Sequence, residues 1–204
     1  MLKKEELLLA VGAGNDVPET LAEAREKIRS GELKVGEIVL FKNGVPWRLV
    51  DLPEGRAVIM TAAAFDYAPF SRPDKRHPWG WNNYMASQIR KELNSVYPEQ
   101  LLGEEKDQLM GHDGERGAMW LLDLEEAGFT QGDGTYEYFR DEDPDVQELK
   151  RQLIDLDGDS TFWWLRSPGP SYASSERYVI TDGELNGTSA CDGTGAVAAC
   201  EIEL

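Results

Sequence analysis

The strongest fold signal in the chain is Phe162-Trp163-Trp164-Leu165-Arg166-Ser167-Pro168-Gly169, where two tryptophans stand side by side before an arginine and a Pro-Gly turn. Successive side chains of a strand point to opposite faces, so Trp163 and Trp164 cannot enter the same core. Both faces are apolar, which predicts a central strand covered on both sides. Arg166 ends the apolar run. Pro168 has no N–H for a sheet ladder, so we expect the strand to end before it.

Outward from this stretch, short apolar runs separated by turn residues predict an antiparallel sheet. Asn43-Gly44 and Asp182-Gly183 each lie between two such runs, and these dipeptides favour tight hairpin turns. The expected strands are 37–41, 45–50, 57–60, 118–122, 162–167, 178–181, 184–189 and 196–202.

Helical patterns occur before and between these runs. In the first 33 residues, Asp16 is placed to cap a helix with Leu21, Ala24 and Ile28 on one face. Further helices are expected over 84–96, ended by Pro98, and over 103–110. The sequence therefore predicts an α+β fold with short antiparallel strands, at least two helices and long loops. We divide it into a helical preface, 1–33, and one domain, 34–204.

The charge of the chain limits its partners. Its 204 residues carry 38 acidic and 21 basic side chains, a formal net charge of -17, so the average surface repels nucleic acid and anionic membranes. The basic cluster Arg72, Lys75, Arg76 and His77 is interpreted as a solvated loop. Acids follow Lys3-Lys4 at once, unlike a secretory signal, and no apolar run approaches a membrane span of about 20 residues. We expect a cytoplasmic or virion-associated protein.

Residues 65–84 combine many aromatic rings with prolines and no regular period. Such a loop either packs on the domain or forms a binding surface, and the irregular spacing favours packing. The rings are Phe65, Tyr67, Phe70, Trp79, Trp81 and Tyr84.

The order of motifs resembles a bacterial and phage domain of unknown function whose members carry WWLRSPG. The matching motifs are VGEIVLF, WRLVDL, SQIRKELN, MWLLDLEEAG, WWLRSPG and VITDGELNG, within 34–204. The resemblance implies a C-type-lectin-like fold, related to formylglycine-generating enzymes and to the variable proteins of diversity-generating retroelements. It transfers no catalytic residue. Residues 195–199, GAVAA, stand where the family usually has GVRPA, so the family's Arg-Pro pair is absent here.

The loops after the WWLRSPG motif are the candidate ligand-binding surface. They mix tyrosine, serine, asparagine and arginine, a composition typical of adaptable recognition loops, and in the related retroelement proteins the variable face lies in this C-terminal region. Ordinary hairpin turns remain the alternative. The candidate residues are Tyr172, Ser174, Arg177, Tyr178, Asn186 and Asp192.

One stretch could hold a metal ion. Asp155, Asp157 and Asp159 alternate along the chain, as carboxylates that meet Ca²⁺ can. An EF-hand loop has a bidentate glutamate at its twelfth position, but counting from Asp155 that position is Arg166 here. A solvated acidic turn is therefore the preferred interpretation. No other cofactor is expected.

We therefore expect a non-enzymatic module that recognises a protein or glycan ligand. Cys191 and Cys200 are expected to be free thiols, yet they invite comparison with the cysteine pair of formylglycine-generating enzymes, so an enzyme on the same scaffold is one alternative. His77 and His112 lie outside nucleophile-elbow motifs and are interpreted as loop residues. The second alternative is an assembly protein that forms homo-oligomers through residues 1–33.

Overall fold

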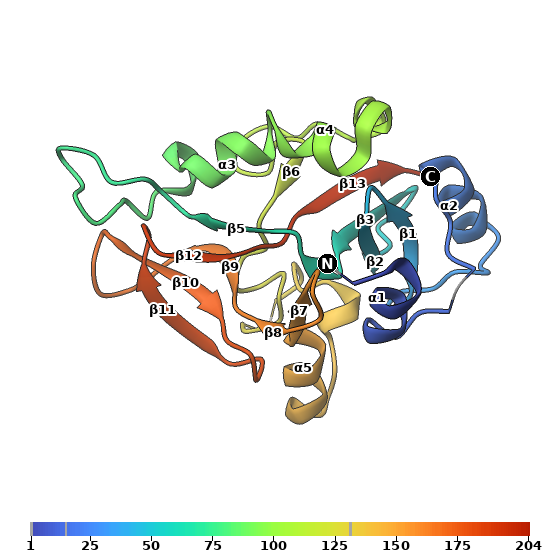
Figure 1. Ribbon diagram of the computed structural model, residues 1–204. Helices are drawn as coiled ribbons and strands as arrows, with labels where there is room; N and C mark the ends of the chain where they lie inside the picture. Colours follow the sequence, from blue (N-terminus) through green and yellow to red (C-terminus); the bar gives the residue numbers. More distant parts are fainter. Residues whose placement is uncertain (1, 15, 131) are drawn as a thin grey trace.

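Short helices and strands alternate along the chain and build an α+β fold with three sheets (Figure 1). The computed structural model describes residues 2–14, 16–130 and 132–204. The helices are α1 Lys4–Ala10, α2 Leu21–Arg29, α3 Gln88–Leu93, α4 Tyr97–Leu102 and α5 Pro144–Arg151, with 3₁₀ turns at Tyr84–Ala86, Gly103–Gln108 and Glu137–Phe139. This confirms the expected fold class at the level of its secondary structure.

The first sheet has the strand order β1-β2-β3-β13-β6. Its members are β1 Ile38–Lys42, β2 Val45–Asp51, β3 Arg56–Thr61, β6 Met119–Trp120 and β13 Ala199–Glu203. Asn43 and Gly44 join β1 to β2 with positive φ values of 50° and 83°, the backbone that a two-residue hairpin turn requires. The predicted first hairpin and third strand are therefore confirmed.

The second sheet has the order β11-β10-β9-β12-β5, and a small third sheet has the order β4-β7-β8. The members of the second sheet are β5 Asp66–Pro69, β9 Trp163–Pro168, β10 Ser175–Val179, β11 Leu185–Ser189 and β12 Gly193–Ala196. Those of the third are β4 Ala63–Ala64, β7 Leu153–Asp155 and β8 Ser160–Thr161.

The WWLRSPG strand is the centre of the second sheet, as predicted. Trp163 and Trp164 are both fully buried. The indole N–H of Trp163 donates to the carbonyl of Arg151 at 2.9 Å, and that of Trp164 donates to the carbonyl of Ala68 at 2.8 Å. The strand runs one residue further than expected, because Pro168 lies at its end, opposite Glu176, with its missing N–H at the edge of the ladder.

The expected last strand, 196–202, is wrong in one respect: it is two strands in two sheets. β12 pairs with β9 and β5, whereas β13 pairs with β3 and β6. Thr61 fixes the crossing, since its N–H donates to the carbonyl of Ala198 and its hydroxyl accepts from the N–H of Ala198. The C-terminal segment thereby joins the two large sheets (Figure 1).

Three details of the predicted helices are also wrong. Thr20, not Asp16, caps α2, and its hydroxyl accepts from the N–H of Glu23. Pro98 does not end a helix but lies in the first turn of α4, where a missing N–H costs nothing. Ser87 interrupts the helix expected over 84–96 and caps α3.

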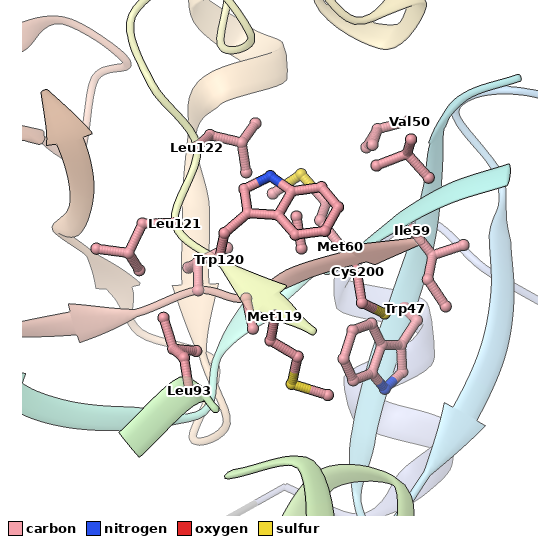
Figure 2. Packing of buried hydrophobic residues seen from close by; sticks show 14 of the residues in the cluster. Trp47, Val50, Ile59, Met60, Leu93, Met119, Trp120, Leu121, Leu122 and Cys200 are labelled. Carbon is pink, nitrogen blue, oxygen red and sulfur yellow. The ribbon is translucent and has the colours of Figure 1, made fainter. Parts of the chain in front are cut away.

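The main core packs on the first sheet, around β2, β3, β13 and β6. Trp47 and Trp120 are fully buried there, and Figure 2 shows Cys200 among them, beside Ile59 and Met60. Burying such large aromatic side chains supplies much of the favourable free energy of folding.

The N-terminal helices pack on the rest of the chain. Leu21, Ala24 and Ile28 of α2 are buried, as the helical pattern predicted, and the N–H of Leu21 donates to Glu105 Oε1 at 2.9 Å. Leu8 of α1 joins a second, smaller apolar cluster. The apolar face of α2 is thus covered within the chain.

No helix in the described part of the chain is long and apolar enough to cross a membrane.

Candidate functional site

Three loops meet at one end of the second sheet, and we call them the loop cluster: residues 71–83, 169–175 and 189–193. Backbone hydrogen bonds tie them together. The N–H of Ser71 donates to the carbonyl of Ala190 at 2.9 Å, that of Ala190 donates to Ser174 at 2.8 Å, and that of Asn82 donates to Ala173 at 2.8 Å. Each loop is therefore held by the other two.

Side chains reinforce these contacts. The amide of Asn82 donates to the carbonyls of Tyr172, at 3.2 Å, and Ser175, at 3.0 Å. The hydroxyl of Ser189 donates to the carbonyl of Trp79 at 3.0 Å. The backbone segments that carry Trp79 and Tyr172 are thereby positioned before any ligand arrives, which lowers the entropy cost of binding.

Gly80 lets the first loop approach the third. Its φ is +78°, and a Cβ atom there would lie 2.8 Å from the carbonyl oxygen of Ser71 and 3.1 Å from the backbone nitrogen of Cys191. Only glycine fits a positive φ at such a close backbone approach.

The loop cluster exposes two large aromatic rings. Trp79 is 68% exposed and Tyr172 is 74% exposed, while the neighbouring Trp81 stacks on His77 with ring centroids 4.7 Å apart and an interplanar angle of 2°. Exposed aromatic rings on ordered backbone mark interaction sites more often than isolated aliphatic side chains do.

The packing predicted for the aromatic loop therefore holds for only part of it. Phe70 and Tyr84 are buried, and Phe70 packs against Trp164 with centroids 5.9 Å apart. Trp79, in contrast, is exposed. The sequence carries a signal for the exposure of Trp79: it lies between Pro78 and Gly80, and these residue types favour a turn at the tip of a loop.

The same loop carries the basic cluster. Arg72, Lys75 and Arg76 are exposed. Asp74 is the acid among them, and its Oδ1 accepts from the N–H of His77 at 2.6 Å and of Arg76 at 2.7 Å. These hydrogen bonds hold the pKa of the Asp74 carboxyl below its usual value. Asp74 thus shapes the turn.

Within the described residues, the side chains of Lys75 and Arg76 have neither an ion pair nor a hydrogen bond. Arg72 makes a loose ion pair, 3.7 Å from Glu92.

The six residues predicted to bind a ligand do not share one surface. Strand register pairs Tyr178 with Asn186 and leaves the neighbouring Arg177 on the opposite face of the sheet. Tyr178 packs against Phe162 and Trp164, with ring centroids 5.6 and 6.1 Å apart. Tyr178 is a packing residue, and Asn186 is exposed beside it.

The other three predicted residues lie in or beside the loop cluster. Tyr172 is its most exposed ring. The carbonyl of Ser174 accepts the hydrogen bond from Ala190. Asp192 is exposed, and its Oδ2 accepts from the hydroxyl of Thr188 at 2.6 Å. The structure therefore brings Tyr172, Ser174 and Asp192 together and leaves the remainder on the sheet.

Arg166 of the motif is a structural residue. It is buried, and its guanidinium donates to Glu126, at 2.5 and 2.9 Å, to Asp123, at 2.6 Å, and to the carbonyl of Leu121. Burial opposes ionisation of Glu126, but the hydrogen bonds and charge of Arg166 outweigh it and lower the pKa of the carboxyl. Gly169, the last residue of the motif, continues the turn: its N–H donates to Ser175.

Glu176 is the buried carboxyl closest to the loop cluster in sequence. It is 0% exposed, its Oε1 accepts from the N–H of Arg177 at 3.1 Å, and its Oε2 has no hydrogen-bond partner in the described part of the chain. Burial raises the pKa of this carboxyl to about 9. A carboxyl with such a pKa is neutral near pH 7.

In the acidic turn that was considered as a possible calcium site, the carboxylate of Asp155 bonds within the fold. Asp155 Oδ1 accepts from the N–H groups of Asp157 and Asp159, and its Oδ2 accepts from the hydroxyl of Tyr67. Among the described residues, no group of three or more histidine, cysteine or acidic side chains is arranged to hold a metal ion. Asp155 organises the turn through its own carboxylate.

The cysteines and histidines do not converge. Both thiols are free, as predicted; Cys200 is buried in the core, where burial raises its pKa, and Cys191 is half-buried in the loop cluster, 3.2 Å from the hydroxyl of Ser189. His112 pairs with the buried Glu201. Among the described residues, no hydrogen bond joins a thiol to a histidine as a nucleophile and its base.

Comparison with known proteins identifies the family. Residues 54–204 match the family model described as a domain of unknown function, DUF6273. Since this is more than half of the chain, the protein belongs to the DUF6273 family. No curated protein and no solved structure matches the chain.

Proposed function

We propose that this DUF6273 protein is a non-enzymatic recognition module and that the loop cluster binds a protein partner. The observation that carries the proposal is the exposure of Trp79 and Tyr172 on two hydrogen-bonded loops. Tryptophan and tyrosine dominate the binding energy of protein interfaces because they bury a large area and have few rotatable bonds.

The shape of the surface favours a protein over a glycan or another small ligand. The segment between β5 and α3, which includes Trp79, extends away from the body of the domain, and the turn between β9 and β10 lies beside it (Figure 1). A projecting loop inserts into a hollow on a macromolecular partner, whereas small ligands bind in concave pockets.

The fold relationship implied by the motif order is consistent with this function. We propose a C-type-lectin-like fold for residues 34–204, and in the related retroelement proteins the variable face lies in this C-terminal region. The loop cluster contains a loop of this region, 169–175, and adds the segment 71–83.

The proposal is tested by selecting a random peptide display library on the wild-type chain and measuring the affinity of the enriched peptides. The double variant Trp79→Ala, Tyr172→Ala is expected to lose at least about tenfold in affinity, since two interface aromatics are removed. Its unfolding free energy should change by less than about 1 kcal/mol, because both rings are exposed.

Leu149→Ala is the matched control. Leu149 is 63% exposed, comparable to Trp79, but lies on α5, outside the loop cluster. Its affinity should equal that of the wild type. Peptides that bind the double variant and the wild type equally well would contradict the proposal.

A further inference from the structure

We infer that the partner segment bound by the loop cluster is acidic: a short stretch of Asp- or Glu-rich polypeptide, held by Arg72, Lys75 and Arg76 beside the exposed rings. The inference rests on the proposed function and names the chemistry of its partner.

The basic segment of the loop cluster is opposite in charge to the chain as a whole. The chain carries a formal net charge of -17, but residues 72–77 contain three cations and one acid. The carboxylate of Asp74 is already occupied by the N–H groups of Arg76 and His77. The segment is therefore locally positive on an acidic protein, and it attracts the anions that the rest of the surface repels.

Two of the three cations, Lys75 and Arg76, are free to pair as far as the described residues show, while Arg72 makes a loose ion pair with Glu92 at 3.7 Å. Over the residues that the structure covers, Lys75 and Arg76 have no side-chain partner. Their positive charges are available to a ligand without first breaking a contact within the chain. Arginine donates to both oxygens of a carboxylate at once, so Arg76 fits an Asp or Glu side chain.

The exposed aromatic rings of the loop cluster are carried by the basic loop and by the loop hydrogen-bonded to it. Trp79 is three residues from Arg76, and its carbonyl is fixed by Ser189, while the backbone of Tyr172 is held by Asn82. The cations thus lie on the same loop as Trp79, and that loop is hydrogen-bonded to the loop that carries Tyr172. This combination of arginine with tryptophan and tyrosine is the composition of binding hot spots, and arginine clusters read acidic motifs.

The acidic body of the protein restricts the size of the ligand. Charges are screened over about 8 Å at physiological ionic strength, so a narrow peptide on the loop cluster avoids most of the repulsion. A nucleic-acid duplex brings a long, dense array of phosphates toward the acidic surface. A short acidic peptide is therefore the better match.

The test measures fluorescence anisotropy of labelled peptides at low and at physiological salt. The probes are an octaglutamate peptide with one central tryptophan, the same peptide with lysines, and the same peptide with serines. The octaglutamate probe is expected to bind most tightly and to weaken as salt rises, because its contacts are ionic.

Two triple variants carry the same change in net charge. Arg72→Gln, Lys75→Gln, Arg76→Gln should weaken binding of the octaglutamate probe by at least about tenfold. The control triple variant removes three exposed cations outside the loop cluster: Arg29→Gln, Lys34→Gln, Lys91→Gln. Its affinity for the octaglutamate probe should change by less than about twofold. Equal effects of the two triple variants would overturn the inference.

Other ligand classes enter as competing probes. An alginate oligosaccharide or a DNA duplex that binds the same three cations more tightly than octaglutamate overturns the acidic-peptide assignment. The wild type could instead bind the serine or lysine probe most tightly and lose that binding in the double variant Trp79→Ala, Tyr172→Ala. This result would overturn the acidic partner but leave the proposed function intact. If no probe responds to the aromatic variants, both proposals fail.

Discussion

Arginines in two regions of this protein have opposite surroundings. Arg166 is buried, and Asp123 and Glu126 surround its guanidinium. Arg76 is exposed in the loop cluster, and its side chain has no partner within the described residues. A buried charge needs its counter-charges for the folded state to be stable. An exposed and unpaired charge lowers the stability of the fold little and is available for binding.

The largest expected effect is at Arg166. Arg166→Ala removes the cation beside Asp123 and leaves the buried Glu126 with only the partly exposed Arg116 as a cationic partner among the described residues. We expect a loss of about 3–5 kcal/mol in the free energy of unfolding. Urea titration followed by tryptophan fluorescence measures it. Arg76→Ala is the contrasting variant and should stay within about 0.5 kcal/mol of the wild type. Similar losses in both variants would remove the distinction between the two regions.

Glu176 adds a third case, because it is a buried acid whose Oε2 atom has no hydrogen-bond partner among the described residues. Its pKa of about 9 when folded exceeds the value of about 4.3 expected in the unfolded chain. Between these values the folded state keeps a proton that the unfolded state releases. The free energy of unfolding should therefore fall as pH rises, by about 1.4 kcal/mol per pH unit from this group.

Glu176→Gln should remove that dependence and stabilise the fold by about 3 kcal/mol at pH 7. The measurement is a set of urea titrations from pH 5 to pH 9. Glu184→Gln, at an exposed position nearby in sequence, is the control and should keep the wild-type pH profile. A Glu176→Gln profile parallel to that of the wild type would show that the carboxyl is ionised when folded.

The smallest effect is expected at Gly80, where the loops touch. Gly80→Ala places a Cβ 2.8 Å from the carbonyl oxygen of Ser71 at a positive φ, which should cost about 1–3 kcal/mol. Hydrogen exchange should show faster exchange of the Ser71 and Ala190 N–H groups. Gly193→Ala, in the same cluster but facing open space, should leave both rates unchanged. Unaltered exchange in Gly80→Ala would mean that the three loops are not mutually held.

Local patterns were sufficient for several elements. Alternation of apolar residues placed Trp163 and Trp164 on opposite faces of a central strand, and Asn43-Gly44 predicted the hairpin between β1 and β2. These predictions succeed because strand faces and tight turns depend on neighbours a few residues away. The same reasoning misplaced the cap of α2, since Asp16 and Thr20 both suit that role and packing selects between them.

The candidate site was predicted only in part. Tyr172 was expected to bind a ligand and is exposed in the loop cluster, but Trp79 was expected to pack and instead extends into solvent. Tyr178 lies against Trp164 rather than beside Tyr172. The sequence lists the residue types of a recognition surface without showing which distant loop, here 71–83, will lie beside 169–175.

By itself, the sequence determined the net charge, the local basic cluster, the central strand and the turns, because each follows from composition or from residues close together in the chain. Only the tertiary structure decided that Arg166 meets Glu126, that 196–202 divides between two sheets, and that Asn82 joins the loops carrying Trp79 and Tyr172. Those contacts join residues far apart in sequence, and their partners are selected by burial and hydrogen bonding across the whole fold.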